Sequence, residues 1–278
     1  MTTTPTTHDF GNGIPVPAHR HVNGGGWVAD SASVDDTAWV DKRATVTGDA
    51  QVAGRAQVLG HAAICGHARV SDRARVAGRA VVGDRAKVAG HARVGGDAWV
   101  HGHARVTGHA RVGDEAQVLD RSQVLDDAWV SEATQVRDDA VVSGDVVIWG
   151  DARIGGAAQV DGDAMVGGGA NVCDHAHISG AAQVSGNARV GGNAVVTGCA
   201  SVHGQARVSG DAVVLGQARV SGDAVVDGNA VVAGDTVIGA EIPPPPPEPE
   251  LQPIDPAPDP VIVASSLEIG FAGPATGL

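Results

Sequence analysis

Small apolar residues recur along most of this chain in one fixed phase. From Ala32 and Val34 onward, an apolar pair two positions apart returns every six residues up to Thr236 and Ile238, which gives thirty-five consecutive hexads. Val or Ile fills the second position of every hexad, and Ala fills the first position in thirty-one of them. The four exceptions at the first position are small or β-branched: Ser122, Thr134, Val146 and Thr236. A phase kept over about 200 residues predicts a repeat protein.

Each hexad predicts one short strand and one corner. In residues 50–55, Ala50 and Val52 project to one side of an extended backbone and Gln51 to the other. Val favours the pleated conformation, whereas Gly54, or Asp in other hexads, tolerates a sharp turn. No hairpin turns separate the strands, so we expect each strand to pair in parallel with the strand one full coil later.

The repeat alone does not determine the number of hexads per coil, because six-residue units fit both a twelve-residue coil and an eighteen-residue coil. A three-sided coil leaves a triangular interior that Ala and Val can fill, whereas flat two-sided coils often need disulfides, so we favour eighteen residues per coil. These hexads resemble the hexapeptide-repeat family, whose members form left-handed parallel β-helices, and the handedness is taken from that resemblance. The predicted fold is an all-β, single-stranded parallel β-helix (a β-solenoid), left-handed and triangular, with about twelve coils.

The two ends of the chain depart from the hexads. We expect residues 1–13 to be disordered, residues 14–31 to form an N-terminal cap in which Trp27 covers the first coil, and residues 32–240 to form the β-helix. Ten of the eighteen residues from Pro243 to Pro260 are Pro, so residues 241–260 are predicted to be a semi-rigid linker. Residues 261–278 form an apolar tail, either a docking peptide or a disordered end.

Composition and cysteine positions narrow the setting. With forty Gly, no Tyr and 3% aromatic residues, the chain has no bulky side chains for an ordinary core. A continuous apolar run of ~18–20 residues is missing, and the first ten residues lack the pattern of a secretory signal, so we expect no membrane span and a cytoplasmic or particle-associated location. Cys65 and Cys173 lie six coils apart in this register, too far for a disulfide.

Stacking at eighteen residues places the outward side chains in columns and separates the charges along the rod. Residues 55–111 contain ten Lys or Arg and three Asp or Glu, whereas residues 113–240 contain six and seventeen. Solubility alone does not require this separation. It predicts either a docking surface for a polyanion or acidic neighbour, or a solvated surface neutralised by corner acids; the stacked basic residues are Arg75, Arg93 and Arg111 in one column and Arg69, Lys87 and Arg105 in another.

A further column is apolar. Val195, Val213 and Val231 stack on one outer face, and exposed apolar columns on solenoids usually contact a partner. The column predicts contact with the tail of the same chain or with another subunit, unless valine is there only for its strand propensity.

Twelve histidines raise the question of catalysis. Hexapeptide acyltransferases, which the repeat resembles, use a His as general base near a coenzyme A site between trimer subunits. The resemblance makes His101, His103 and His109 the candidate catalytic residues, with His91 on the corner below His109. Active sites of that family commonly depend on loops that project from the coils, and no loop interrupts residues 26–239, so we favour structural roles for the histidines. A metal pair at His101 and His103 has no assignable third ligand, and no metal site is predicted.

Two hypotheses for function remain. We favour a non-catalytic structural rod without a cofactor, which self-assembles as a trimer or filament, or docks on a filament, fibre or spike, through its outer faces and tail. Bacterial bactofilins are similar in plan, and virion fibres also use β-solenoids. Nucleic acid is not expected as a partner at a net charge of −13. The alternative is an acyltransferase that uses acetyl-CoA, because residues 19–240, beginning at His19–Val28, resemble bacterial proteins assigned to the hexapeptide acetyltransferases without an established activity.

Overall fold

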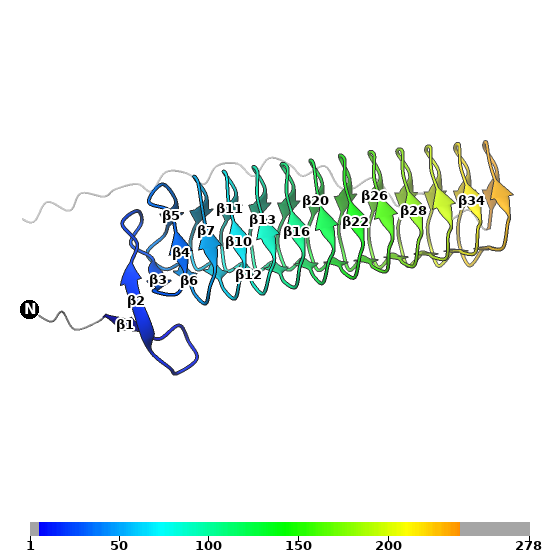
Figure 1. The fold of residues 1–278 in the computed structure, drawn as a ribbon. Coiled ribbons are helices and arrows are strands. Elements are labelled where there is room, and N and C mark those ends of the chain that lie inside the picture. The colour runs from blue at the N-terminus through cyan, green and yellow to red at the C-terminus, as the bar shows by residue number, and fades with distance from the viewer. Residues whose placement is uncertain (1–5, 240–278) are drawn as a thin grey trace, which may run out of the picture. The chain divides into compact units, whose positions relative to one another are not determined.

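The repeats form one rod of stacked coils. A computed structural model of the chain describes residues 6–239, and Figure 1 shows the successive coils following one another along a single axis from β3 to the last strands. Apart from two strands at the N-terminus, every strand belongs to one of three parallel sheets of twelve strands, and each strand pairs with the strand eighteen residues later. This confirms the predicted left-handed, triangular parallel β-helix with twelve coils.

The three sheets form the three faces of the rod. The first face consists of β3 (Trp27–Ala29), β6 (Thr45–Val46), β9 (Ala63–Ile64), β12 (Val81–Val82), β15 (Trp99–Val100), β18 (Gln117–Val118), β21 (Gln135–Val136), β24 (Arg153–Ile154), β27 (Asn171–Val172), β30 (Arg189–Val190), β33 (Arg207–Val208) and β36 (Val225–Val226). The second face consists of β4 (Ser33–Val34), β7 (Gln51–Val52), β10 (Arg69–Val70), β13 (Lys87–Val88), β16 (Arg105–Val106), β19 (Gln123–Val124), β22 (Val141–Val142), β25 (Gln159–Val160), β28 (His177–Ile178), β31 (Val195–Val196), β34 (Val213–Val214) and β37 (Val231–Val232). The third face consists of β5 (Trp39–Val40), β8 (Gln57–Val58), β11 (Arg75–Val76), β14 (Arg93–Val94), β17 (Arg111–Val112), β20 (Trp129–Val130), β23 (Val147–Ile148), β26 (Met165–Val166), β29 (Gln183–Val184), β32 (Ser201–Val202), β35 (Arg219–Val220) and β38 (Val237–Ile238).

The interior contains the two apolar positions of each hexad. Ala and Val side chains from all three faces meet in one continuous core, and nearly all of them are fully buried. Two buried hydroxyls replace Ala at inward positions: the Ser122 hydroxyl donates to the Leu119 carbonyl at 2.6 Å, and the Thr134 hydroxyl donates to the Ser131 carbonyl at 2.7 Å. Both buried hydroxyls are therefore satisfied by the corner that precedes their own strand.

From Gly48 onward, the corners place one residue of each hexad in the left-handed region. Gly occupies most of these positions, and eight acidic residues occupy others with φ between 53° and 63°. Each of the eight carboxylates accepts a hydrogen bond from the backbone N–H of the corner residue one coil later, as Asp84 does from Gly102 at 3.0 Å. The acids thus stabilise the corners through a contact that Gly cannot make.

A turn closes the N-terminal end of the rod. β2 (Val16–Arg20) pairs antiparallel with β3 and also with β1 (Thr7–His8). Between β2 and β3, the Asn23 carbonyl accepts from the Val40 N–H, and the Gly26 N–H donates to the Val40 carbonyl. The expectation that Trp27 covers the first coil is wrong: its ring lies on the outer side of β3 between the His8 ring (4.2 Å) and the Arg20 guanidinium (4.1 Å). Residues 21–26 close the coil instead, because their backbone fits against Val40.

Two predicted segments at the C-terminal end fall on residues that the structure does not describe. The predicted linker, 241–260, and tail, 261–278, lie outside the described residues. Among residues 6–239 no helix has the length and apolar character that a membrane crossing requires.

The corner carboxylates predict a specific pH dependence of stability. The N–H of Gly102 lowers the pKa of Asp84, and the N–H of Gly192 lowers that of Asp174. A carboxyl with a lowered pKa stabilises the fold above its unfolded-state pKa, and this contribution is lost as the pH falls through the folded-state pKa. We expect the variant with Asp84→Gly and Asp174→Gly to lose less thermal stability than the wild type on acidification, as measured by melting temperature against pH.

Glycine is the substitution of choice because it already occupies most corners and introduces no backbone strain. Asp163→Asn is the matched control, since Asp163 forms no side-chain hydrogen bond or ion pair with the described residues. The prediction would be contradicted if the melting temperatures of the wild type and the double variant fell by the same amount on acidification.

Candidate functional site

The basic columns lie where the sequence places them. Arg75, Arg93 and Arg111 pair in adjacent coils of the third face. Arg69, Lys87 and Arg105 pair in the same way on the second face. Both columns belong to the same coils, so two of the three faces are basic over this part of the rod.

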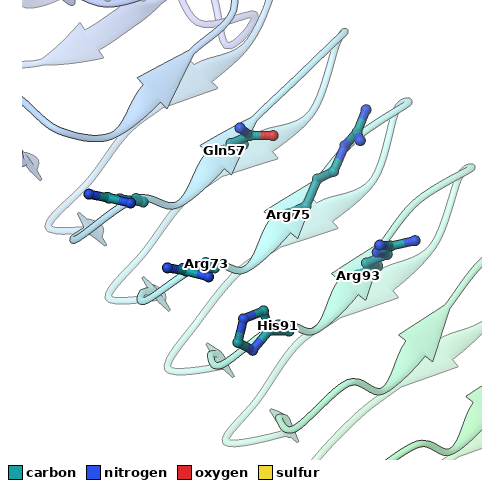
Figure 2. A pocket seen from close by; sticks show the side chains of 6 residues that line it. Gln57, Arg73, Arg75, His91 and Arg93 are labelled. Atoms are coloured by element: carbon teal, nitrogen blue, oxygen red, sulfur yellow. The ribbon is translucent and has the colours of Figure 1, made fainter.

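A groove runs along the arginine column of the third face. Gln57, Arg75 and Arg93 project from successive strands, and the corner residues Arg55, Arg73 and His91 line its other side, as Figure 2 shows for all but Arg55, which it does not label. The groove has a volume of about 320 Å³. We call it the third-face groove. It arises because residues eighteen apart stack, so that a corner position and the outward strand position two residues later produce two parallel rows of side chains.

The arginine column of the third face has no acidic partner among the described residues. Among residues 6–239, Arg79 pairs with Asp97 and Arg121 with Asp139, but Arg75, Arg93 and Arg111 form no ion pair or side-chain hydrogen bond. Like charges directly opposite each other on neighbouring strands repel. Guanidinium groups bind phosphate through two parallel hydrogen bonds, so an anion bound here gains hydrogen bonds and relieves this repulsion.

A histidine pair continues the corner row of the groove. The His91 and His109 rings stack with their centroids 5.0 Å apart, which confirms that His91 lies on the corner below His109. His109 Nδ1 lies 3.6 Å from a carboxylate oxygen of Asp127, the residue eighteen positions later, and both side chains are exposed. This arrangement leaves Nε2 of His109 directed away from the carboxylate. A histidine oriented by a carboxylate is the usual arrangement for a general base.

His101 lies at another corner and is oriented inward. Its Nδ1 is 3.4 Å from Asp84, and its ring covers Gly83, where an added Cβ would lie 2.6 Å from Cε1. Its Nε2 is buried and has no hydrogen-bond partner among the described residues. The absence of a side chain at Gly83 therefore leaves room for the His101 ring. The buried Nε2 of this ring is poorly placed to contact a substrate.

His103 lines a groove of the second face. Its neighbours there are Arg69, Lys87 and Arg105, together with His67 and Arg85, and the groove has a volume of about 470 Å³. No carboxylate of the described residues lies within ion-pair distance of His103. His101 and His103 thus share one corner but have different surroundings, and His109 lies on the next corner. Of these three histidines, only His109 combines an exposed side chain, a nearby carboxylate and arginines without an ion pair among the described residues.

The described residues do not favour a nucleophilic cysteine or a metal site. Burial, and then the charge of Asp84, raises the pKa of the Cys65 thiol. Burial raises the pKa of Cys173 as well, with a further contribution from its hydrogen bond to Asp174. A raised pKa keeps a thiol protonated and weakly nucleophilic. Within residues 6–239, no three His, Cys, Asp or Glu side chains are grouped closely enough to hold a metal ion.

The predicted apolar column keeps its register on the second face. Val195 pairs with Val213, which pairs with Val231. The first two side chains are half-buried, whereas Val231 is 68% exposed. The column lies more than four coils beyond Arg105 on the same face, so it takes no part in the basic grooves.

Two residues of the third-face groove, and the carboxylate beside His109, were not identified from the sequence. Arg55 and Arg73 precede the arginine column on the corner, and Asp127 follows His109 by one coil. The signal was present: a spacing of eighteen residues puts any two side chains in adjacent coils. Applying that spacing to the corner positions as well as to the strand positions would have found the His109–Asp127 pair.

Comparison with known proteins gives a repeat type and a fold. The YdcK β-solenoid repeat matches residues 182–198, about one coil. No curated protein sequence matches the chain. Solved UDP-N-acetylglucosamine acyltransferases are similar in fold: those of Bacteroides fragilis (13% identity, TM-score 0.40, 58% of this chain and 66% of that one), Francisella novicida (13%, 0.38, 63% and 66%) and Campylobacter jejuni (20%, 0.29, 60% and 71%). This chain spans slightly less than two thirds of the length of the first two.

These findings correct the favoured prediction of function. We predicted a non-catalytic structural rod of the filament, fibre or spike type, and the solved structures named above are acyltransferases. That prediction is wrong. At these identities and TM-scores the likeness is one of fold, so an activity has to be argued from this chain's own residues.

The unpaired arginines predict a salt-dependent effect on stability. We expect Arg93→Gln to raise the melting temperature at low ionic strength, because it removes the central charge of the column. The rise should vanish in high salt, since the screening length falls from about 30 Å at 0.01 M to about 3 Å at 1 M. Arg79→Gln is the matched control: Arg79 pairs with Asp97, so its removal should leave the melting temperature unchanged or lower it. A lower melting temperature of Arg93→Gln at low salt would contradict the prediction.

Proposed function

We propose that the chain is an acyltransferase that moves an acyl group from coenzyme A to a hydroxyl or amine of an acceptor at the third-face groove. One observation carries this proposal: the exposed His109–Asp127 pair adjoins a column of arginines that have no acidic partner among the described residues. A histidine base beside guanidinium groups that lack a counter-charge suits a reaction between a phosphorylated donor and an acceptor that gives up a proton. The resemblance to hexapeptide acyltransferases points to the same donor.

The donor's phosphates suit the arginine column. Coenzyme A carries a pyrophosphate and a further phosphate, and Arg75, Arg93 and Arg111 present guanidinium groups in three successive coils. Adjacent coils are about 4.8 Å apart, so neighbouring guanidinium groups can contact neighbouring phosphates. The bound phosphates would supply the counter-charge that the column lacks, and the donor supplies the activated thioester.

His109 would manage the proton. Its Nε2 takes the proton from the acceptor hydroxyl or amine as the acceptor oxygen or nitrogen bonds to the acyl carbon. The bond from that carbon to sulfur breaks, and His109 returns the proton to the departing thiolate, which leaves as the thiol. Asp127, near Nδ1, holds the ring orientation and stabilises the imidazolium between the two transfers.

The groove is shallow and lies on an outer face, so a single copy surrounds the reacting groups only in part. The resemblance implies trimers with the site at the subunit boundary, and a second copy covering the third face would exclude water from the thioester. The proposal therefore includes self-association through this face.

The experiment is an acetyl-transfer assay with acetyl-CoA, an acceptor panel of amines and hydroxyls, and thiol release as the readout. We expect His109→Gln to lower the rate by about 10²- to 10⁴-fold, the usual contribution of a general base. Asp127→Asn should lower kcat by a smaller factor and leave coenzyme A affinity unchanged. Arg93→Gln should weaken coenzyme A binding, measured by calorimetry, more strongly at low salt than at high salt.

His175→Gln is the matched control, because His175 occupies the same hexad position on a different corner and forms no ion pair with the described residues. Its rate should equal that of the wild type. Absence of thiol release with every acceptor, or an equal rate for His109→Gln and the wild type, would overturn the proposal.

A further inference from the structure

A second depression follows the other side of the arginine column. Ala77, Gly95 and Gly113 lie in successive coils at the corner position after the strand, and the depression between them and the arginines has a volume of about 240 Å³. Arg75, Arg93 and Arg111 form one wall, and Trp129 closes one end. We call this depression the tryptophan trough.

The trough exists because two corners lack a side chain that their position permits. A Cβ added to Gly95 or Gly113 meets no atom within 4 Å. Neither residue has a positive φ, so the backbone does not require glycine at these points. The equivalent corners of other coils carry larger side chains, such as Leu59 and Trp149. The two glycines therefore leave an open floor beside the arginines that a ligand can occupy.

Trp129 gives this floor an aromatic end. It pairs with Arg111 of the preceding coil on the third face, and 48% of the residue is exposed. The other exposed tryptophans differ in their surroundings: Trp99 lies on the first face beside the His101 ring, and Trp39 lies close to Gly24 of the closing turn. Trp129 alone of these three directly adjoins the arginine column, since Gln57 separates Trp39 from Arg75.

The two chemistries select one class of ligand. Guanidinium groups in successive coils bind phosphates, and an exposed indole beside an open floor stacks on a planar ring. We propose that the tryptophan trough binds the nucleotide part of a phosphorylated ligand, with a purine base against Trp129 and its phosphates on Arg111 and Arg93. The inference rests on the proposed function for the anion-binding role of the arginines, and it identifies where the nucleotide end of the donor lies.

The test compares ADP, which has a base and phosphates, with tripolyphosphate, which has phosphates alone. Binding is measured by calorimetry and, for ADP, also by quenching of tryptophan fluorescence. We expect the wild type to prefer ADP, and Trp129→Ala to weaken ADP binding by about 5- to 100-fold while tripolyphosphate affinity stays unchanged, because stacking on one base has roughly this value. Gly113→Leu should have the same effect by filling the floor, and Leu59 shows that leucine is accommodated at this corner position.

Trp39→Ala is the matched control and should bind both ligands as the wild type does. Unchanged tripolyphosphate binding also shows that the variants remain folded. Equal affinity of the wild type for ADP and tripolyphosphate, or full ADP affinity in both Trp129→Ala and Gly113→Leu, would overturn the inference. If ADP binds at Trp129 but no acceptor is acylated, the proposed function fails and the nucleotide site stands. If an acceptor is acylated but Trp129→Ala does not change ADP binding, the proposed function stands and the nucleotide site fails.

Discussion

The structure depends on one backbone contact that recurs at most corners of the rod. A residue in the left-handed conformation lies directly against the corner of the next coil, and a Cβ added to Gly102, for example, would come within 2.7 Å of the Asp120 carbonyl oxygen. Over residues 48–234, only residues that accept this conformation occupy the fifth position of the hexad, which restricts it to Gly, Asp and one Glu. The acids add a hydrogen bond from their carboxylate to the following coil, so the contact that restricts the sequence also strengthens the rod.

Because the corners and the core fix the coil at eighteen residues, outward side chains stack in exact register whether or not their chemistry favours it. Stacking concentrates similar groups, which is costly for Arg75, Arg93 and Arg111 in the absence of an anion. The same register brings Asp127 to His109 and Trp129 to Arg111. The grooves of the third face thus need no projecting loop, since rows of side chains on neighbouring positions form their walls.

The fold was predictable because a single pattern determines it: Ala and Val two apart, then a turn residue, repeated without interruption. Column membership followed from the same pattern, as Arg69, Lys87 and Arg105 illustrate. The site was less predictable because it depends on side-chain direction within a corner. The ring of His101 turns over Gly83, whereas His109 lies beside Asp127, and the repeat gives the hexad position of each residue but not the direction of its ring. The position of Trp27 was predicted wrongly because an antiparallel strand, β2, pairs with β3 of the first coil, and the repeat pattern does not predict that strand. The structural-rod prediction gave too much weight to the absence of loops.

The eighteen-residue coil also constrains how such a chain can change in length. Removing one hexad between Arg93 and Arg111 would keep every inward residue in phase but rotate everything after it by one face. Arg111 and Trp129 would then leave the face that carries Arg93, and His109 would leave the corner that carries His91. Removing a whole coil would preserve all three faces and only shorten the columns. Duplication and loss in units of three hexads are therefore the length changes that this rod can undergo with its surfaces intact.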